Sequence, residues 1–238
     1  MDGAVREVVR AERLTVDYGG APVVLDFSLA VAAGEFVGLM GQPGCGKSTA
    51  LLALTGLTRS GGHIGAGRVL LGEEDLLQAG PARLAEVRGA RIGLVTQNPR
   101  AALHPMLSVG RQLVNVYRSH HRGSASAARA HARHMLELVG IHDAARRLGA
   151  HVHELSTGMA QRVVIAMALA CEPDLLIADE PTSGLDVTIQ AQILERLREA
   201  AAEVGSAVLL ATQDLGIVAN YCDRVAIMHD GRVVEDRP

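Results

Sequence analysis

The sequence predicts an α/β protein in which buried strands alternate with helices. The first observation is a glycine-rich loop at 41–49, which follows the apolar run 36–40 and precedes the helical run 50–54. The second is a set of further buried strands, at 92–96, 174–180 and 206–212. The third is a long stretch of helical composition, about 101–155, with apolar residues at helical spacing.

Length and composition narrow the class of protein. A chain of 238 residues can form one large domain or a domain with a lobe, and 48% apolar with 2% aromatic residues predicts a core of Ala, Val, Leu and Ile. A net charge of -3 does not favour nucleic-acid binding. Three cysteines without pairing or metal-ligand spacing suit a reducing cytoplasm.

The charged segment 1–14 lacks the apolar stretch of a signal peptide, and the longest apolar run, 163–171, is too short to cross a bilayer. Any membrane role would therefore come through a partner.

The loop at 41–49 has the spacing G-x-x-x-x-G-K-[ST] of a phosphate-binding P-loop. Its glycines let the backbone curl with the N–H groups pointing inward, and the following helix N-terminus adds partial positive charge. Lys47 would reach the β- and γ-phosphates of a nucleoside triphosphate, and the Ser48 hydroxyl would help to hold Mg²⁺. The residues expected to contact the nucleotide are Gly41, Gly44, Cys45, Gly46, Lys47, Ser48 and Thr49. A turn that binds nothing is disfavoured, because strand, loop and helix are in register.

Residues 7–31 have the pattern of short strands, turned at Gly19-Gly20. Tyr18 stands just before this turn. An aromatic ring there could stack on an adenine, or it could be an ordinary half-buried strand tyrosine, and both interpretations remain open. Further on, Ser60-Gly61-Gly62 and Gly65-Ala66-Gly67 are expected to break the chain before a strand at 68–71.

The helical stretch is expected to form about three helices, divided at Gly123-Ser124 and Gly140, in a separate small lobe. It also carries four clustered histidines: His120, His121, His131 and His134. Imidazoles in such a cluster can bind a transition metal. Because no carboxylate or cysteine set accompanies them and arginines lie nearby, we interpret them as solvated surface histidines.

A second informative stretch begins at Ser156, which occupies the N-cap position before the helical run 160–170. The exposed N–H groups there could accept an anion. The strand at 174–180 then ends in two carboxylates. Asp179 is placed to hold Mg²⁺ through water, and Glu180 to orient or deprotonate the water that attacks a γ-phosphate. A plain solvated loop is disfavoured by the P-loop in the same chain.

The rest of the chain continues the α/β pattern. Residues 181–186 turn into an amphipathic helix at 187–204, and the strand at 206–212 ends at Gln213. A final hairpin joins 225–228 to 232–235, turned at Asp230-Gly231.

In this order the motifs resemble the nucleotide-binding subunit of ATP-binding-cassette (ABC) transporters, over nearly the whole chain. Residues 155–159 resemble the signature L-S-G-G-Q/M, Gln97 the Q-loop, 183–186 the D-loop, and Tyr18 the A-loop aromatic. Within the family, the stretches similar to the peptide and nickel importer class are Gln97-Asn98-Pro99-Arg100, Leu103-His104-Pro105 and Met159. Asn98-Pro99-Arg100 is most similar to the nickel-import ATPase.

The resemblance implies a single ABC ATPase domain over 1–238. It would be a P-loop NTPase core of the α/β class, with an antiparallel β lobe and an inserted α-helical lobe at about 98–158. It also implies a head-to-tail dimer, in which each ATP lies between the P-loop of one subunit and Ser156 and Gly158 of the other. By this resemblance, the catalytic residues would be Glu180, Gln213 and Gln97, and the Mg²⁺ site would comprise Ser48, Gln97 and Asp179.

The implied partners are membrane-spanning permease subunits and a second ABC ATPase subunit, identical or different. Nucleic acid is not among them. The chain would lie peripherally at the cytoplasmic face of the inner (plasma) membrane, and would meet the membrane only through its partners. Gln97 would link the γ-phosphate region to the helical lobe, where a coupling helix of a permease subunit would dock.

Three residues depart from the family pattern. Pro43 removes one possible hydroxyl contact to phosphate, Thr157 replaces the first signature glycine, and Gln213 replaces the switch histidine. Gln can donate a hydrogen bond to a γ-phosphate but cannot carry positive charge. Two hypotheses follow: an active ATPase of an importer for peptides, nickel or metal chelates, or an ATP-binding structural subunit with an attenuated site beside an active paralogue. Relatives continue beyond Pro238, so we expect a short member or a trimmed chain.

Overall fold

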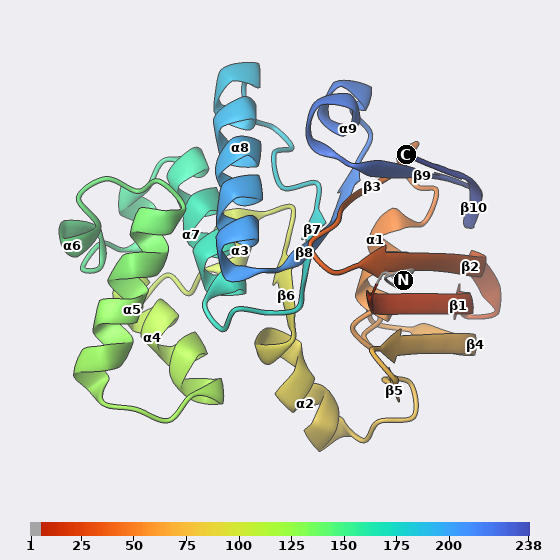
Figure 1. Ribbon diagram of the computed structural model, residues 1–238, viewed down its shortest axis with the longest axis horizontal. Helices are drawn as coiled ribbons and strands as arrows, with labels where there is room; N and C mark the ends of the chain where they lie inside the picture. Colours follow the sequence, from red (N-terminus) through yellow and green to blue (C-terminus); the bar gives the residue numbers. More distant parts are fainter. Residues whose placement is uncertain (1–5) are drawn as a thin grey trace, which may run out of the picture. The chain divides into compact units, whose positions relative to one another are not determined.

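The computed structural model describes residues 6–238, which divide into two compact units (Figure 1). Unit 1 combines the chain up to Arg88 with Ala207–Pro238, and unit 2 is Gly89–Ser206. Each unit has its own strands, helices and core. The predicted helical-lobe boundary at 98–158 stays a prediction.

Unit 1 contains most of the strands. They are β1 (Glu7–Tyr18), β2 (Ala21–Ala32), β3 (Phe36–Gly41), β4 (Gly62–Leu71), β5 (Glu74–Asp75), β8 (Ala207–Thr212), β9 (Arg224–His229) and β10 (Arg232–Arg237). Its helices are α1 (Lys47–Ala53), α9 (Leu215–Tyr221) and most of α2 (Pro81–Ala90). The short helices α2 and α9 had not been predicted.

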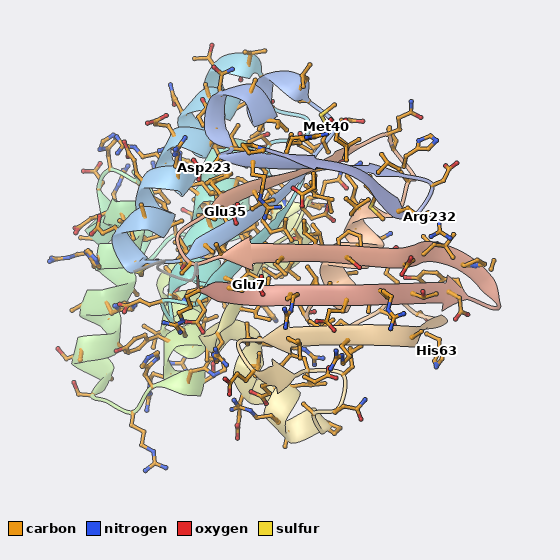
Figure 2. All side chains as sticks on the ribbon, turned by 45° about the vertical axis from the view of Figure 1, so that its right-hand side comes forward. Glu7, Glu35, Met40, His63, Asp223 and Arg232 are labelled. Carbon is orange, nitrogen blue, oxygen red and sulfur yellow. The ribbon has the colours of Figure 1, made fainter. Side chains whose placement is uncertain are left out.

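The antiparallel sheet has the strand order β2-β1-β4-β5, which confirms the expected antiparallel β lobe (Figure 1). The expectation of short strands was wrong, because β1 and β2 are each 12 residues long. Arg13 and Asp26 have φ of 49° and 51° beside register shifts, so bulges interrupt the alternation of each strand without ending it. In Figure 2, Glu7 and His63 mark the two ends of this sheet.

The glycines at 65–67 do not break the chain as expected, but lie inside β4. Gly67 has φ 99°, and a Cβ there would lie 2.6 Å from Cα of Leu14 on the neighbouring strand β1. Glycine in a strand often marks such a close backbone approach. The glycine run therefore permits tight packing of β4 on β1.

The second group of strands in unit 1 is mainly parallel. β3 lies between β8 and β9, parallel to both, and β10 returns antiparallel to β9. β3 is buried over Phe36–Leu39 and β8 is buried throughout, the continuous apolar pattern of strands covered on both faces. Met40 pairs with Thr212, so β3 and β8 end at the same edge. The predicted hairpin is confirmed, because β9 and β10 pair antiparallel with Arg232 opposite His229, so the chain turns at Asp230-Gly231.

Unit 2 is mainly helical. Its elements are β6 (Ile92–Val95), α3 (Pro99–Ala102), α4 (Val109–His120), α5 (Ala125–Leu138), α6 (Ala144–Arg147), η1 (Val152–Glu154), α7 (Thr157–Leu169), β7 (Leu175–Asp179) and α8 (Val187–Val204). β6 pairs with β7 in parallel. Ser108, Ser124 and Ser156 each accept a backbone hydrogen bond as the N-cap of α4, α5 and α7. Helix α7 packs against α3, α4, α5, α8 and β6, so it forms the centre of the unit 2 core.

The interpretation of the four histidines as solvated surface residues was wrong for His131. Its ring is half-buried, its Nε2 lies 2.7 Å from the carbonyl oxygen of Ala170, and it packs on the Tyr117 ring at 4.3 Å between centroids. His121 stacks on the same tyrosine, at 4.5 Å. Tyr117 belongs to α4, the helix that precedes α5, and the spacing of residues in the sequence does not reveal this contact between helices.

The start of β3 in unit 1 is held by an ionic cluster, of which Figure 2 labels Glu35 and Asp223. Arg224 donates to Glu35 Oε1 at 2.6 Å and to the Asp236 carboxylate, and Asp223 accepts from the Phe36 amide at 2.9 Å. Burial alone would raise the pKa of Glu35. The hydrogen bonds from Arg224 and the Ala32 amide outweigh that effect, so the pKa of Glu35 lies below its ordinary value.

We therefore expect Arg224→Met to lower the free energy of unfolding near neutral pH by about 2 kcal/mol, because it leaves a largely buried carboxylate without its cation. Since the folded-state pKa of Glu35 is depressed, this stabilisation is present above its ordinary pKa and is lost as the pH falls through the depressed value. Urea unfolding of both proteins should show the difference at pH 7 and a smaller one below about pH 4. Arg83→Met, which breaks an exposed pair with Glu74, is the control and should scarcely shift the midpoint. A difference that does not shrink in acid would contradict the assignment.

Candidate nucleotide-binding site

The loop between β3 and α1 closes around a lysine side chain. As predicted, the loop joins a buried strand to a helix. β3 ends at Gly41, and α1 begins at Lys47, earlier than the predicted helical run 50–54. The Lys47 ammonium donates to the carbonyl oxygens of Gly41 and Gln42, at 2.8 and 3.1 Å, and the residue is only 5% exposed. In the described part of the chain its hydrogen bonds go to these two carbonyls, and an ammonium has three N–H donors. The remaining donor can meet an anion held by the loop.

Two glycines of this loop have no room for a side chain. At Gly41, a Cβ would collide with the backbone of β9 and with the buried Cys45 sulfur. Gly46 has φ 108°, and its Cβ would lie 2.7 Å from the carbonyl oxygen of Val23. The Gly231 amide donates to the carbonyl oxygen of Cys45 at 3.0 Å and so ties the loop to the β9–β10 turn. The loop is therefore a bare backbone surface supported from behind by strands.

Lys47 is the only lysine among the 238 residues, and the remaining 22 of the 23 lysine and arginine residues are arginines. This chain uses arginine wherever a cation lies on its surface. A guanidinium is a broad planar fork with five donors, whereas an ammonium is a compact point charge. The two carbonyls around this nearly buried position suit the compact group. This contrast can be read directly from the sequence.

Tyr18 ends β1 in unit 1 and is half-buried there. A Cβ on Gly62 would lie 2.8 Å from Cε1 of the tyrosine, so the ring packs directly against that glycine of β4. Its hydroxyl is buried and has no hydrogen-bond partner within residues 6–238. The half-buried strand tyrosine is thus what the structure contains, and stacking on an adenine stays a prediction.

Gln213 directly follows β8 and is exposed. Because Thr212 pairs with Met40, the end of β8 lies beside the start of the P-loop, at the carboxyl edge of parallel strands. The next residue, Asp214, accepts from the Gly216 amide at 2.8 Å as the N-cap of α9. The structure therefore presents the Gln213 side chain at the P-loop edge of unit 1.

In unit 2, the paired strands β6 and β7 end beside each other, with Val95 opposite Ala178. Two residues past β6, Gln97 Nε2 donates to Glu180 Oε2 at 3.0 Å and lies 3.3 Å from Ser183 Oγ. Sequence analysis predicted these residues as separate motifs and missed their contact. The parallel pairing is what brings them together.

The two predicted acidic residues differ in their environment. Asp179 is the last residue of β7, and its Oδ1 is buried without a hydrogen-bond partner among the described residues. Glu180 has φ 45°, an uncommon conformation for a residue with a side chain, and such strain tends to occur at functional sites. The backbone turn there is closed by the Ser183 amide, which donates to the Glu180 carbonyl oxygen at 3.1 Å.

The signature segment 155–159 lies at the start of α7. The Ser156 hydroxyl accepts from the Met159 amide at 3.3 Å, which confirms its predicted N-cap role. A Cβ on Gly158 would lie 3.0 Å from Cγ2 of Ile189, so α8 packs closely against it. Thr157, which lies between Ser156 and Gly158 in the chain, is exposed. The carbonyl oxygen of Leu155 accepts from Arg100 Nη2 at 2.9 Å, a contact that the sequence did not reveal.

A cavity of about 370 Å³ lies beside this segment within unit 2, with Ser156, Gly158 and Met159 in its wall. Arg162 also lines it and donates to the carbonyl oxygens of Val139 and Gly140. Burial lowers the pKa of Arg162, and its neighbour Arg196 adds to the effect. The signature serine and glycine thus line a hollow whose wall is partly polar and partly apolar.

The family model described as ABC transporter matches residues 24–183, which include the P-loop, the signature segment and both acidic residues. The chain belongs to the ABC transporter family. This ABC family member is 47% identical, over 206 residues, to a probable peptide ABC transporter ATP-binding protein of Sinorhizobium fredii, with 86% of this chain and 62% of that protein covered. It is 44% identical, over 220 residues, to a dipeptide transport ATP-binding protein of Bacillus subtilis, with 92% of this chain and 66% of that protein covered.

The chain therefore spans 62% and 66% of the lengths of these two relatives. Among solved structures, it resembles an ATP-binding cassette in a dimeric post-hydrolysis state with ADP and Pi, with a TM-score of 0.84 and 28% identity over 96% of this chain and 97% of that one. The predicted P-loop cassette fold is confirmed. No helix among the described residues of this family member has the length and apolar character needed to cross a membrane.

We expect Lys47→Ala in this ABC family member to weaken ATP binding at least about tenfold, because the loop would keep only backbone donors for the phosphates. Lys47→Arg should weaken it about as much, although the charge is kept, since the fork does not suit a site bounded by two carbonyls. Calorimetric titration with ATP measures both, and circular dichroism checks the fold. Unchanged affinity in Lys47→Ala would refute the P-loop assignment.

Proposed function

We propose that this chain is the ATP-hydrolysing motor subunit of an ABC importer for peptides. The observation that carries the proposal is the P-loop, a glycine backbone surface with one nearly buried lysine ammonium behind it. The names of the two relatives favour a peptide cargo. A nickel or metal-chelate cargo is suggested by Asn98-Pro99-Arg100 alone. It has weaker support than a peptide cargo, because 44–47% identity to peptide transport proteins extends over most of the chain.

In this proposal, the P-loop backbone and Lys47 bind the phosphates of ATP. Asp179 would hold Mg²⁺ through a water molecule, together with Ser48 and Gln97. Support comes from Asp179 Oδ1, which is buried and has no hydrogen-bond partner among residues 6–238, and which is an acceptor of the hard oxygen type that this cation prefers. Mg²⁺ would neutralise the charge that develops on the phosphates. Glu180, held by Gln97, would orient the attacking water. Tyr18 would stack on the adenine.

The proposed partners are membrane-spanning permease subunits and a second ABC ATPase subunit, the same or a paralogue. The chain would act at the cytoplasmic face of the inner membrane without entering it, and nucleic acid is not a proposed ligand. ATP would join two subunits head to tail, because Ser156 and Gly158 of one chain would complete the site of the other. Hydrolysis would then release the subunits and drive the permease cycle.

A dimer should therefore accumulate when ATP is bound but not hydrolysed. In Glu180→Gln the attacking water loses its base, so ATP and Mg²⁺ should convert a monomer into a dimer, either with itself or with a paralogous ATPase subunit. Light scattering with and without ATP measures the change. The control is Glu180→Gln combined with Lys47→Ala, which should stay monomeric. A Glu180→Gln monomer under all conditions, with or without the paralogue, would contradict the ATP-bridged dimer.

Gln213 decides between an active motor and the alternative, an ATP-binding structural subunit with an attenuated site. We propose a working but slowed site, because Glu180 is present and is held by Gln97. Restoring a histidine should accelerate ATP hydrolysis, since one transition-state hydrogen bond or charge in a preorganised site accounts for roughly 10²–10³ in rate. Gln213 is exposed, so Gln213→His should leave the fold intact.

Steady-state phosphate release by wild type, Gln213→His and Glu180→Gln separates the cases. A faster Gln213→His with unchanged ATP affinity would support the slowed motor. If Gln213→His has no effect while Glu180→Gln abolishes activity, glutamine is a tolerated substitute and the attenuated-site hypothesis fails. If wild type and Gln213→His both lack activity, alone and with the paralogue, the proposed motor function itself fails.

A further inference from the structure

Residues 97–100 connect the Glu180 carboxylate to the signature segment within unit 2. At one end, Gln97 donates to Glu180 Oε2 at 3.0 Å. At the other end, Arg100 Nη2 donates to the carbonyl oxygen of Leu155 at 2.9 Å. Leu155 directly precedes Ser156. Glu180 and the signature segment 155–159 are more than twenty residues apart in the sequence. Residues 97–100 link them, because the Gln97 side chain bonds to one and the Arg100 side chain to the other.

The bridge itself is a well-defined turn. Asn98 is the N-cap of α3, and its Oδ1 accepts from the Ala101 amide at 3.2 Å. Pro99 follows at the first helical position, where its ring fixes φ, and it is buried. Helix α3 packs against α7, the helix that begins at the signature segment. Gln97 and Arg100 are therefore held at a fixed spacing.

The acceptor end is equally defined. The Leu155 side chain is 3% exposed, and its amide donates to the carbonyl oxygen of Val152 at 3.2 Å. With the Leu155 side chain and N–H held, rotation about ψ of Leu155 still decides where its carbonyl points. The hydrogen bond from Arg100 fixes that direction, and with it the Leu155–Ser156 peptide plane, whose N–H belongs to the N-cap residue of α7. Arg100 itself is exposed, so it contributes little to the core.

We propose that Arg100 is a positioning residue for the signature segment, which sets the orientation of Ser156 and couples it to Gln97 and Glu180. This rests on the proposed function, in which Ser156 meets the nucleotide carried by a second subunit. Arg100 would touch no nucleotide. Its loss would misplace Ser156 for the transition state and for the ATP-bridged dimer, while the P-loop would still bind ATP.

The test compares Arg100→Met, which keeps the chain length but removes the donors, with Arg100→Lys, which keeps a charged donor. ATP hydrolysis by Arg100→Met should have a kcat lowered about tenfold, a part of the 10²–10³ that a preorganised transition-state donor supplies. Its KM for ATP should change less than about twofold, because Lys47 is untouched. Arg100→Lys should regain most of the rate. The control is Arg129→Met, an exposed arginine of α5 in the same unit, which should behave as wild type.

A second measurement does not depend on turnover. In the Glu180→Gln background, Arg100→Met should raise the ATP concentration needed for dimerisation, measured by light scattering, whereas Arg129→Met should not. If the Glu180→Gln protein dimerises with ATP and Arg100→Met changes neither this nor kcat, the positioning role is refuted and the proposed function stands. If Glu180→Gln never dimerises with ATP, the ATP-bridged dimer of the proposed function fails first. A loss shared equally by Arg129→Met would also overturn the inference, as would a rise in KM matching the fall in kcat.

Discussion

The ammonium of Lys47, enclosed by the carbonyl oxygens of its own loop, is the interaction on which the candidate site depends. A nearly buried cation is stable only where partners surround it, and here the backbone itself supplies them. That arrangement requires a strand ending at Gly41, glycines that let the backbone close, and a helix beginning at the lysine. A chain that otherwise uses only arginine retains lysine here, which indicates that size and charge together decide this position.

Parallel strands explain how residues that are distant in the sequence come together within each unit. In unit 1, the pairing of β3 with β8 brings Gln213 to the P-loop edge. In unit 2, the pairing of β6 with β7 brings Gln97 to Glu180. Carboxyl ends of neighbouring parallel strands gather at one edge, which is why loops there carry function in α/β proteins. The positive φ of Glu180 costs conformational energy at such an edge, and the fixed strand and the Ser183 amide hold it.

The parts that sequence could predict are those whose physics is local. The P-loop, the Ser156 cap and the Asp230-Gly231 turn each depend on residues within one short segment. The parts that it could not predict depend on a neighbour from elsewhere. Glycines in β4 look like chain breakers until β1 packs on them, His131 looks solvated until Tyr117 covers it, and Arg100 looks like a class marker until its carbonyl partner is placed. The roles of Gly67 and Arg100 depend on their distances to Leu14 and to the Leu155 carbonyl oxygen, and sequence spacing does not give such distances.

The three residues that depart from the family pattern are all exposed, which limits the structural effect of each. Pro43, Thr157 and Gln213 are all exposed, while the residues that hold their segments, such as Cys45, Leu155 and Thr212, are buried. A substitution at an exposed position leaves the packed scaffold unchanged and changes mainly what the surface offers a ligand. Such substitutions therefore have little effect on the free energy of unfolding, and the side chain that a loop presents to a ligand can change while the loop backbone stays in place. For this reason the slowed turnover expected from Gln213 is a property of one side chain and not of an altered fold.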